Sequence, residues 1–183
     1  MVKALLKSPD VKHSCNAGMI AAIRNGNLPF VDMLLESRPI DMAHYDDEGY
    51  TPLIRALNSG HVHVIKSLLE RGLVNPNQTD RNSKSPLLWA VEQDNENAIQ
   101  LLLNTGEVDV NRHYGDWGTA LMYAAKKKKQ QATLWLLNCP RVTVVPYAFT
   151  IRNYVDNWGI RVNTKTKNKI LSHVKLGISR RWW

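Results

Sequence analysis

The fold is decided by residues 51–72, which read TPLIRALNSGHVHVIKSLLERG. Thr51 is a suitable helix N-cap because its hydroxyl can accept a hydrogen bond from an unpaired amide of the first turn. Pro52 fits the first helical position, where no backbone donor is needed. Apolar residues follow at helical spacing up to Gly60, and again after it as far as Gly72. The stretch therefore predicts two short helices that pack antiparallel on each other across a turn.

The same pattern recurs every 34 residues along the chain. A leucine pair marks the second helix of each copy, at residues 34–35, 68–69, 102–103 and 136–137. A segment near the start of the first helix lies at a constant distance upstream, and it reads AGMI from Ala17, TPLI from Thr51, SPLL from Ser85 and TALM from Thr119. Two landmarks in one register indicate an internal repeat. Neither helix could bury its apolar face alone, so the repeats are expected to stack.

The segments between the helix pairs are polar and rich in turn-forming residues, as in VNPNQTDRNSK at 74–84. Such composition predicts extended or hairpin-like loops. The sequence thus predicts an all-α solenoid of four stacked helix-turn-helix repeats at 17–50, 51–84, 85–118 and 119–146. We expect a capping half-repeat at 1–16 and a basic C-terminal cap and tail at 147–183.

These residues resemble the ankyrin repeat, whose pattern runs T-P-L-H-x-A-A-x-x-G-H and on to V-x-x-L-L-x-x-G. Residues 51–72 follow it most closely, 85–111 and 118–140 repeat it, and 17–39 is a degenerate copy. The segment LLLNTGEVDVN is similar to the 34-residue variety frequent in filamentous-fungal ankyrin arrays. The resemblance covers about residues 14–146. It implies an ankyrin-repeat solenoid that acts as a scaffold for binding another protein and has no catalytic role.

The chain departs from the family pattern in two respects. The histidine of T-P-L-H is replaced by Ile20, Ile54, Leu88 and Met122. We therefore expect the hydrogen-bond network that this histidine anchors to be absent, with apolar stacking in its place. In the fourth repeat Lys128 stands at the turn position held by Gly26 and Gly60, and residues 130–133 are QQAT. We expect this repeat to be the weakest.

Both ends leave the repeat register. Segment 2–11, VKALLKSPDV, places its first apolar residues on one helical face and predicts an N-terminal capping helix. A reading frame that starts inside a longer ankyrin array is the alternative. At the other end, the motif that the register requires near Asn153 is missing. Residues 147–158 are predicted as a capping helix, and 167–176 as an amphipathic segment surrounded by lysines.

The net charge of +8 is concentrated at the C-terminus. Residues 1–146 hold 16 basic and 15 acidic side chains, whereas 147–183 hold eight basic and one acidic. Such asymmetry is typical of nucleic-acid or anionic-surface contacts, and also of termini that serve solubility. Association with nucleic acid through this tail is the rival functional hypothesis.

Cys15 and Cys139 stand far apart in sequence, so free thiols in a reducing compartment are expected. The start MVKALLKSPDVK is too weakly apolar for a signal peptide, and no run approaches the roughly 18 apolar residues of a transmembrane helix. We therefore expect an intracellular protein, cytoplasmic or nuclear, that is soluble and monomeric and has no transmembrane segment.

The residues that carry chemistry in other proteins form no catalytic pattern here. His13 and Cys15 have no further ligand at metal-site spacing. His61 and His63 are two residues apart on a helix and point to different faces, so they cannot chelate one ion. The acidic turn at 46–48 lacks the alternating oxygen ligands of a calcium loop. We predict no enzyme activity, no metal and no cofactor.

The resemblance implies that a protein partner contacts the loop tips and the exposed side of the first helices, which together line a concave surface. Tyr50 and Trp117 are the candidate aromatic anchors there. The lysine run 126–129 suits either a solvated helix end or an acidic partner, and Trp89 and Trp135 are assigned to packing within the repeats. Carried over residue by residue, the partner-binding set is Asp47, Glu48, Tyr50, Asn58, Ser59, Arg81, Asn82, Lys84, Glu92, Gln93, Asp116, Trp117, Lys126 and Lys127.

Overall fold

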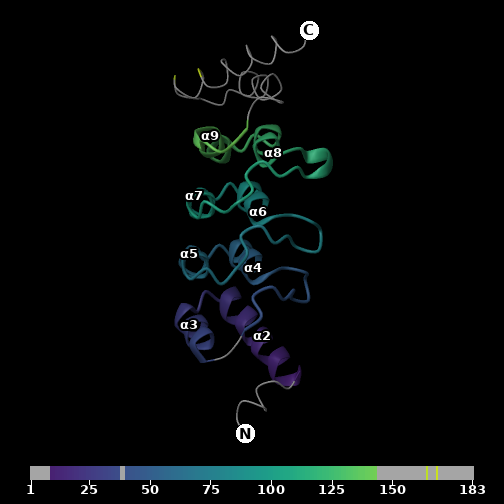
Figure 1. The fold of residues 1–183 in the computed structure, drawn as a ribbon, viewed down its shortest axis with the longest axis vertical. Helices are drawn as coiled ribbons and strands as arrows, with labels where there is room; N and C mark the ends of the chain where they lie inside the picture. The colour runs from purple at the N-terminus through teal and green to yellow at the C-terminus, as the bar shows by residue number, and fades with distance from the viewer. Residues whose placement is uncertain (1–8, 38–39, 144–163, 165–167, 169–183) are drawn as a thin grey trace. The chain divides into compact units, whose positions relative to one another are not determined.

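The computed structural model describes residues 9–37 and 40–143, together with the single residues 164 and 168. The expectations for segment 2–8, for the capping helix at 147–158 and for most of the basic tail at 147–183 lie outside the described residues. Within them the chain is helical (Figure 1), with α2 Pro9–Arg24, α3 Leu28–Ser37, α4 Pro52–Ser59, α5 Val62–Glu70, α6 Pro86–Glu92, α7 Glu96–Asn104, η1 Gly115–Trp117, α8 Ala120–Lys126 and α9 Gln130–Asn138. The described residues form no extended strand ladder, and their one isolated β-bridge joins His113 to Thr119. The all-α helical-repeat prediction is confirmed.

The chain divides into two compact units. The first unit consists of residues 1–89 and 104–107, and the second consists of residues 90–103 and 108–183. The first unit therefore holds α2 to α5 and the start of α6, whereas the second holds most of α7 together with η1, α8 and α9.

Helix α4 forms for the local reasons that its sequence contains. The Thr51 hydroxyl accepts a hydrogen bond from the Ile54 amide at 3.3 Å, and Pro52 occupies the first helical position. At the other end Gly60 adopts φ 72°, and its amide donates to the carbonyl groups of Ala56 and Leu57. Backbone groups at both ends of the helix thus find hydrogen-bond partners in the caps, as the cap residues predict.

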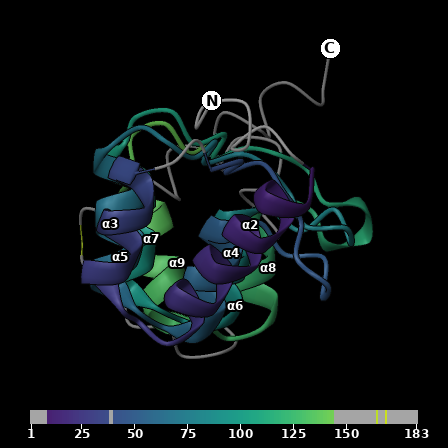
Figure 2. The same ribbon diagram turned by 90° about the horizontal axis from the view of Figure 1, so that it is seen from below.

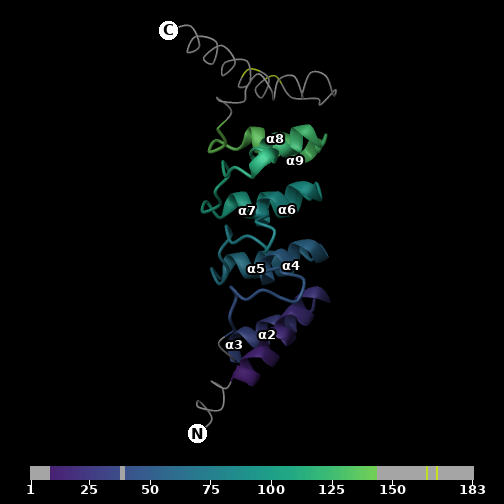
Figure 3. The same cartoon turned by 90° about the vertical axis from the view of Figure 1, so that its right-hand side faces the viewer.

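The core of the first unit lies between two layers of helices. Helix α2 packs on α4 and α3 packs on α5, so that first helices lie over first helices and second over second (Figure 2). Helices α4 and α5 run side by side within their repeat (Figure 3). The fully buried apolar side chains of this unit include Met19, Ile23, Val31, Leu53, Ile54, Leu57, Ile65 and Leu68. Their spacing follows the 34-residue register, which is why stacking buries them together.

Helix α2 begins earlier than the repeat pattern indicates. It starts at Pro9 and runs without interruption to Arg24, through the boundary at residues 16 and 17 that the sequence pattern suggested. Proline at the first helical position is well tolerated, and no second proline interrupts the segment that follows it. The first helix of this repeat is therefore 16 residues long, twice the eight of α4.

In the second unit, α8 packs against α9 and buries Leu121, Leu136 and Leu137. The turns that precede α7 and α9 hold Asp94 at φ 53° and Lys128 at φ 58°. Lys128, which the register places at the turn position of Gly26 and Gly60, thus adopts the left-handed conformation that those glycines adopt in the first unit. The relative weakness of the fourth repeat stays a prediction.

The loops are held by an asparagine that recurs with the period. The Asn77 side-chain amide donates to the carbonyl of Glu107 at 2.9 Å in the first unit. Asn111, which lies 34 residues further on, donates to the carbonyl of Arg141 at 2.9 Å in the second. Each bond joins residues 30 positions apart. Side-chain hydrogen bonds to the backbone, rather than a β-ladder, therefore connect these loops to the next ones.

Candidate functional site

Two buried aspartates shape the loops that precede α4 and α6. One carboxylate oxygen of Asp46, Oδ1, accepts hydrogen bonds from the amides of Glu48 at 3.0 Å and Tyr50 at 2.9 Å. Asp80 repeats this arrangement 34 residues later, where its Oδ1 accepts from the amides of Asn82 and Lys84 at 2.9 and 2.8 Å. Because each carboxylate closes its own loop, both loop tips have a defined conformation.

The other oxygen of each aspartate binds the helix that follows. Oδ2 of Asp46 accepts from Nε of Arg55 at 2.8 Å, and Oδ2 of Asp80 accepts from the indole nitrogen of Trp89 at 2.9 Å. The expectation that apolar stacking would take the place of the network that the family's histidine anchors is therefore incomplete for these two repeats, because polar groups also bond there. The bonds from Asp46 to Arg55 and from Asp80 to Trp89 supply a different network. Arg55 and Trp89 each stand one position after the residue that replaces the histidine, where the loop aspartate meets the start of the helix.

Arg55 is a buried cation of the first unit. Its Nη2 lies 2.6 Å from Oδ2 of Asp46 and 2.9 Å from Oε1 of Glu48, and its side chain is only 4% exposed. Burial by itself would lower the pKa of Arg55, but the hydrogen bonds and charges of Glu48 and Asp46 together raise it above its ordinary value. Glu48 also pairs with Arg24 of α2 at 2.6 Å, so two helices share one carboxylate.

Two aromatic rings in contact lie beside this ion pair, with one cation against each ring. The Arg55 guanidinium lies 4.6 Å from the centre of the Tyr50 ring. Tyr50 packs edge-to-face on Trp89, with ring centres 5.2 Å apart, and the Lys84 ammonium lies 4.2 Å from the Trp89 ring. Each such contact is worth about 0.5–1.5 kcal/mol. We call Arg55, Tyr50, Trp89 and Lys84 the aromatic–cation row.

The loop at 80–84 packs on the loop before it through Arg81. The Arg81 amide donates to the carbonyl of Gly49 at 3.1 Å, and its guanidinium lies 5.8 Å from the centre of the Tyr45 ring. Gly49 has φ 83°, and a Cβ at that position would lie 2.9–3.0 Å from the Arg81 side-chain carbons. Glycine is therefore required at 49 both by its backbone conformation and by the approach of Arg81.

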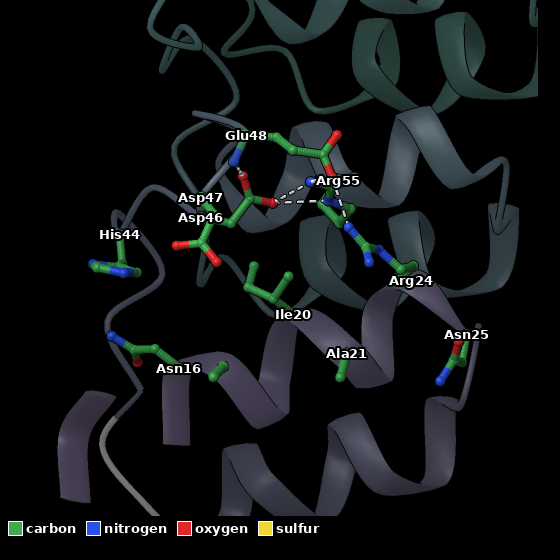
Figure 4. A pocket seen from close by; sticks show the side chains of 11 residues that line it. Asn16, Ile20, Ala21, Arg24, Asn25, His44, Asp46, Asp47, Glu48 and Arg55 are labelled. Atoms are coloured by element: carbon green, nitrogen blue, oxygen red, sulfur yellow. Dashed lines mark hydrogen bonds and ion pairs between the residues drawn. The ribbon is translucent and has the colours of Figure 1, made fainter. Parts of the chain in front are cut away.

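A cleft of about 370 Å³ opens between α2 and the segment 44–48 (Figure 4). The apolar side chains of its lining belong to Ala17, Ile20 and Ala21 on α2, and we call them the floor of the cleft. Polar and charged groups line the rest of it, and they belong to Asn16, Arg24, Asn25, His44, Asp46, Asp47, Glu48 and Arg55. Such a volume lies near the lower end of the range for small-ligand sites, about 300–1,000 Å³.

The structure brings together one part of the predicted partner-binding set. The members that share the two loops of the first unit are Asp47, Glu48, Tyr50, Arg81, Asn82 and Lys84. Asn58 and Ser59 lie at the opposite end of α4, about 10 Å from its start at a rise of 1.5 Å per residue. The sequence pattern did not identify Asp46, Arg55, Asp80 and Trp89 as site residues. Asp46 and Asp80 are 34 positions apart, as are Arg55 and Trp89, and this interval was a usable signal.

The remaining predicted residues belong to the second unit. Glu92 accepts a hydrogen bond from the Tyr123 hydroxyl at 3.1 Å. Burial, and then the charge and hydrogen bond of Glu92, raise the pKa of Tyr123 to about 12. Gln93, Asp116, Lys126 and Lys127 are exposed, and the side chain of Trp117 lies outside the described residues. The binding role of the whole set stays a prediction.

The histidines and cysteines have structural surroundings. Nε2 of His61 lies 3.0 Å from the carbonyl oxygen of Arg24, and Nε2 of His63 lies 3.0 Å from that of Gly26, so both rings hold the turn after α2. Neither Cys15 nor Cys139 forms a disulfide in the part of the chain that is described. Over the same residues, no three histidine, cysteine or acidic side chains gather as metal ligands, and no helix is long and apolar enough to cross a membrane.

Paired helices on a 34-residue period, with capped first helices and loops closed by their own side chains, define a helical-repeat protein. Comparison with known families identifies the type of repeat. Residues 1–80 and 72–145 match a family model described as ankyrin repeats in three copies, so the chain belongs to the ankyrin-repeat family. Among curated proteins, none matches the sequence significantly. Ankyrin repeats generally mediate protein–protein interactions, and the family is typically non-catalytic.

Proposed function

We propose that this protein is a non-catalytic scaffold that binds a protein partner through a surface of the first unit. We call it the loop surface, and it comprises residues 44–50, residues 80–84 and the exposed side of α2. One observation carries the proposal. Asp46 and Asp80 each use both carboxylate oxygens to hold a loop tip against the helix that follows it.

Such a surface suits recognition because its conformation exists before a partner arrives. Ordering flexible side chains and loops opposes association, and a surface already held by hydrogen bonds avoids most of that cost. Tyr50 and Trp89 are partly exposed and fixed by their neighbours. Aromatic residues held in this way are frequent among those that dominate protein interfaces. Exposed Arg81 and Asn82 supply a polar rim.

The charge pattern supports a polar partner surface rather than an apolar one. The tip at 46–48 is acidic, whereas exposed Arg81 and half-buried Lys84 make the next tip basic. Two adjacent tips of opposite sign orient an approaching protein and disfavour partners of uniform charge.

The test compares charge reversal on the loop surface with the same reversal elsewhere. Arg81→Glu combined with Lys84→Glu is expected to abolish capture of a partner that the wild-type protein retains from the native cell extract, as read by mass spectrometry. The control, Lys66→Glu with Arg71→Glu, alters two exposed cations on and just after α5 and should retain that partner. Circular dichroism checks that both variants are folded. Equal capture of the partner by the wild type and by the Arg81→Glu/Lys84→Glu variant would contradict the proposal.

The basic tail supports a second candidate function, association with nucleic acid. Residues 147–183 carry a net charge of +7, which a phosphate backbone would attract. The binding constant for a duplex oligonucleotide is then expected to fall steeply with salt concentration, and a chain ending at Pro146 should not bind. Binding that survives this truncation contradicts the tail hypothesis.

A further inference from the structure

We infer that the cleft between α2 and the segment 44–48 receives a cationic side chain, lysine or arginine, of the protein partner. This inference rests on the proposed function and specifies which partner chemistry one part of the loop surface recognises. Three observations support it: the charge of the lining, the apolar floor and the state of Asp47.

The charge of the lining is net negative. Three carboxylates, those of Asp46, Asp47 and Glu48, face two guanidinium groups, those of Arg24 and Arg55. Arg55 is almost wholly buried beneath Asp46, and Arg24 is occupied by Glu48 at 2.6 Å. One negative charge is therefore left without a counterion in the lining.

Asp47 carries that charge. Oxygens of Asp46 and Glu48 are held by backbone amides and by the two arginines, whereas the exposed carboxylate of Asp47 makes no hydrogen bond or ion pair with any described residue. Its side chain points into the opening between His44 and Ile20 (Figure 4). A cation entering the cleft would meet this carboxylate first.

The floor explains why the cation should come on a long side chain. Ala17, Ile20 and Ala21 present only aliphatic groups, which favour the methylene stem of lysine or arginine while the charged end stays at the polar rim. An acidic partner side chain would be repelled by Asp47. An apolar one would remove water from Asp47 without replacing its hydrogen bonds, which is unfavourable.

Two small probes of equal shape test the inference on the full chain. Nα-acetyl-arginine methylamide carries the guanidinium, and Nα-acetyl-citrulline methylamide replaces it with a neutral urea. In NMR titrations at constant ionic strength, the arginine probe is expected to shift the amide signals of Ile20, Ala21 and Asp47 saturably. Its affinity should exceed that of the citrulline probe roughly fivefold, the effect of one partly exposed ion pair.

Two variants locate the interaction. Asp47→Asn should lower the affinity for the arginine probe to that for the citrulline probe, whereas Glu70→Gln, at an exposed carboxylate of α5, should leave it unchanged. Ala21→Leu narrows the floor and should weaken the binding of both probes.

Three results would each overturn the inference: equal affinity for the two probes, undiminished arginine binding by the Asp47→Asn variant, or no saturable shift with either probe. Failure here is distinct from failure of the proposed function. If charge reversal of Arg81 and Lys84 abolishes partner capture but the wild-type protein binds neither probe, the proposed function stands. Only the inference that the cleft receives a cationic side chain is then wrong.

Discussion

Asp46 and Arg55, nine residues apart, form a buried ion pair that fastens the loop before α4 to the helix itself. Nη2 of Arg55 lies 2.6 Å from Oδ2 of Asp46, and the two side chains are 4% and 7% exposed. A pair so buried adds little net stability compared with apolar residues of similar volume, but removal of one partner is costly. Its role in this protein is to position the loop.

Replacing Asp46 with alanine is therefore expected to lower the free energy of unfolding by about 3 kcal/mol. The variant leaves Arg55 with only Glu48, and it removes the acceptor of the Glu48 and Tyr50 amides. Urea denaturation followed by circular dichroism measures the loss. Asp47→Ala, one residue away and exposed, serves as the control and should change stability by less than about 0.5 kcal/mol. Equal effects of the two variants would contradict the role given to Asp46.

Gly49→Ala should destabilise the protein by about 2 kcal/mol, because φ 83° disfavours any side chain and the new Cβ would collide with Arg81. Gly60→Ala separates the two causes. Gly60 has φ 72° and open space around its Cβ position, so its cost is conformational only, about 1 kcal/mol. Thermal denaturation compares the pair, and the double variant Gly49→Ala/Arg81→Ala should recover part of the loss. A larger cost at Gly60 than at Gly49 would show that Arg81 does not restrict the site.

Lys128→Gly should raise the free energy of unfolding by about 0.5–1 kcal/mol, because Lys128 is held at φ 58° in the turn before α9. Lys126→Gly in the last turn of α8 is the matched control and should lower it by a similar amount, since glycine weakens a helix. Lys128→Ala retains the strained conformation and tests whether the lysine side chain itself contributes. Stabilisation by alanine as large as that by glycine would contradict the backbone explanation.

The raised pKa of Tyr123 predicts how the free energy of unfolding changes at alkaline pH. The folded protein raises its pKa to about 12 from the ordinary value of 10.0, so above about pH 10 the unfolded chain releases a proton that the folded chain retains. The stabilisation is complete below pH 10 and is lost as the pH rises towards 12, by up to about 2 kcal/mol. Urea denaturation at a series of pH values should show this decline in the wild type and a smaller one in Tyr123→Phe. Glu92→Gln removes one cause of the shift and should give an intermediate decline, and identical pH profiles for all three proteins would rule Tyr123 out.

Much of the fold is predictable because its determinants are local. Thr51 and Gly60 satisfy the ends of α4 within a few residues of chain, so cap chemistry is legible without knowledge of packing. The 34-residue register alone places Lys128 at the turn position of Gly26 and Gly60, whereas its left-handed conformation is a finding of the structure. The start of α2 at Pro9 was not foreseen, since the repeat pattern marks only the part of that helix from Ala17 onward.

The candidate site was only partly predictable, because its contacts join residues that no local rule connects. Tyr50 and Trp89 are 39 positions apart, and the sequence pattern assigned Trp89 to packing without indicating that its indole would bind Asp80. The cleft likewise joins α2 to a segment more than twenty residues further along the chain. Position at a loop tip predicted that Asp47 and Glu48 would be accessible. It did not predict that two arginines would share Glu48, or that Asp47 would have no counterion among the described residues.

The sequence by itself therefore determined the period, the capped helix pairs and the membership of a family that generally binds proteins. The physical reason is that apolar spacing and cap residues act over one or two helical turns and repeat with the chain. Only the tertiary structure decided which polar groups meet. The partners of Asp46, Asp80 and Glu48 depend on how successive helices and loops stack, and stacking sets the side-chain geometry that a one-dimensional pattern does not contain.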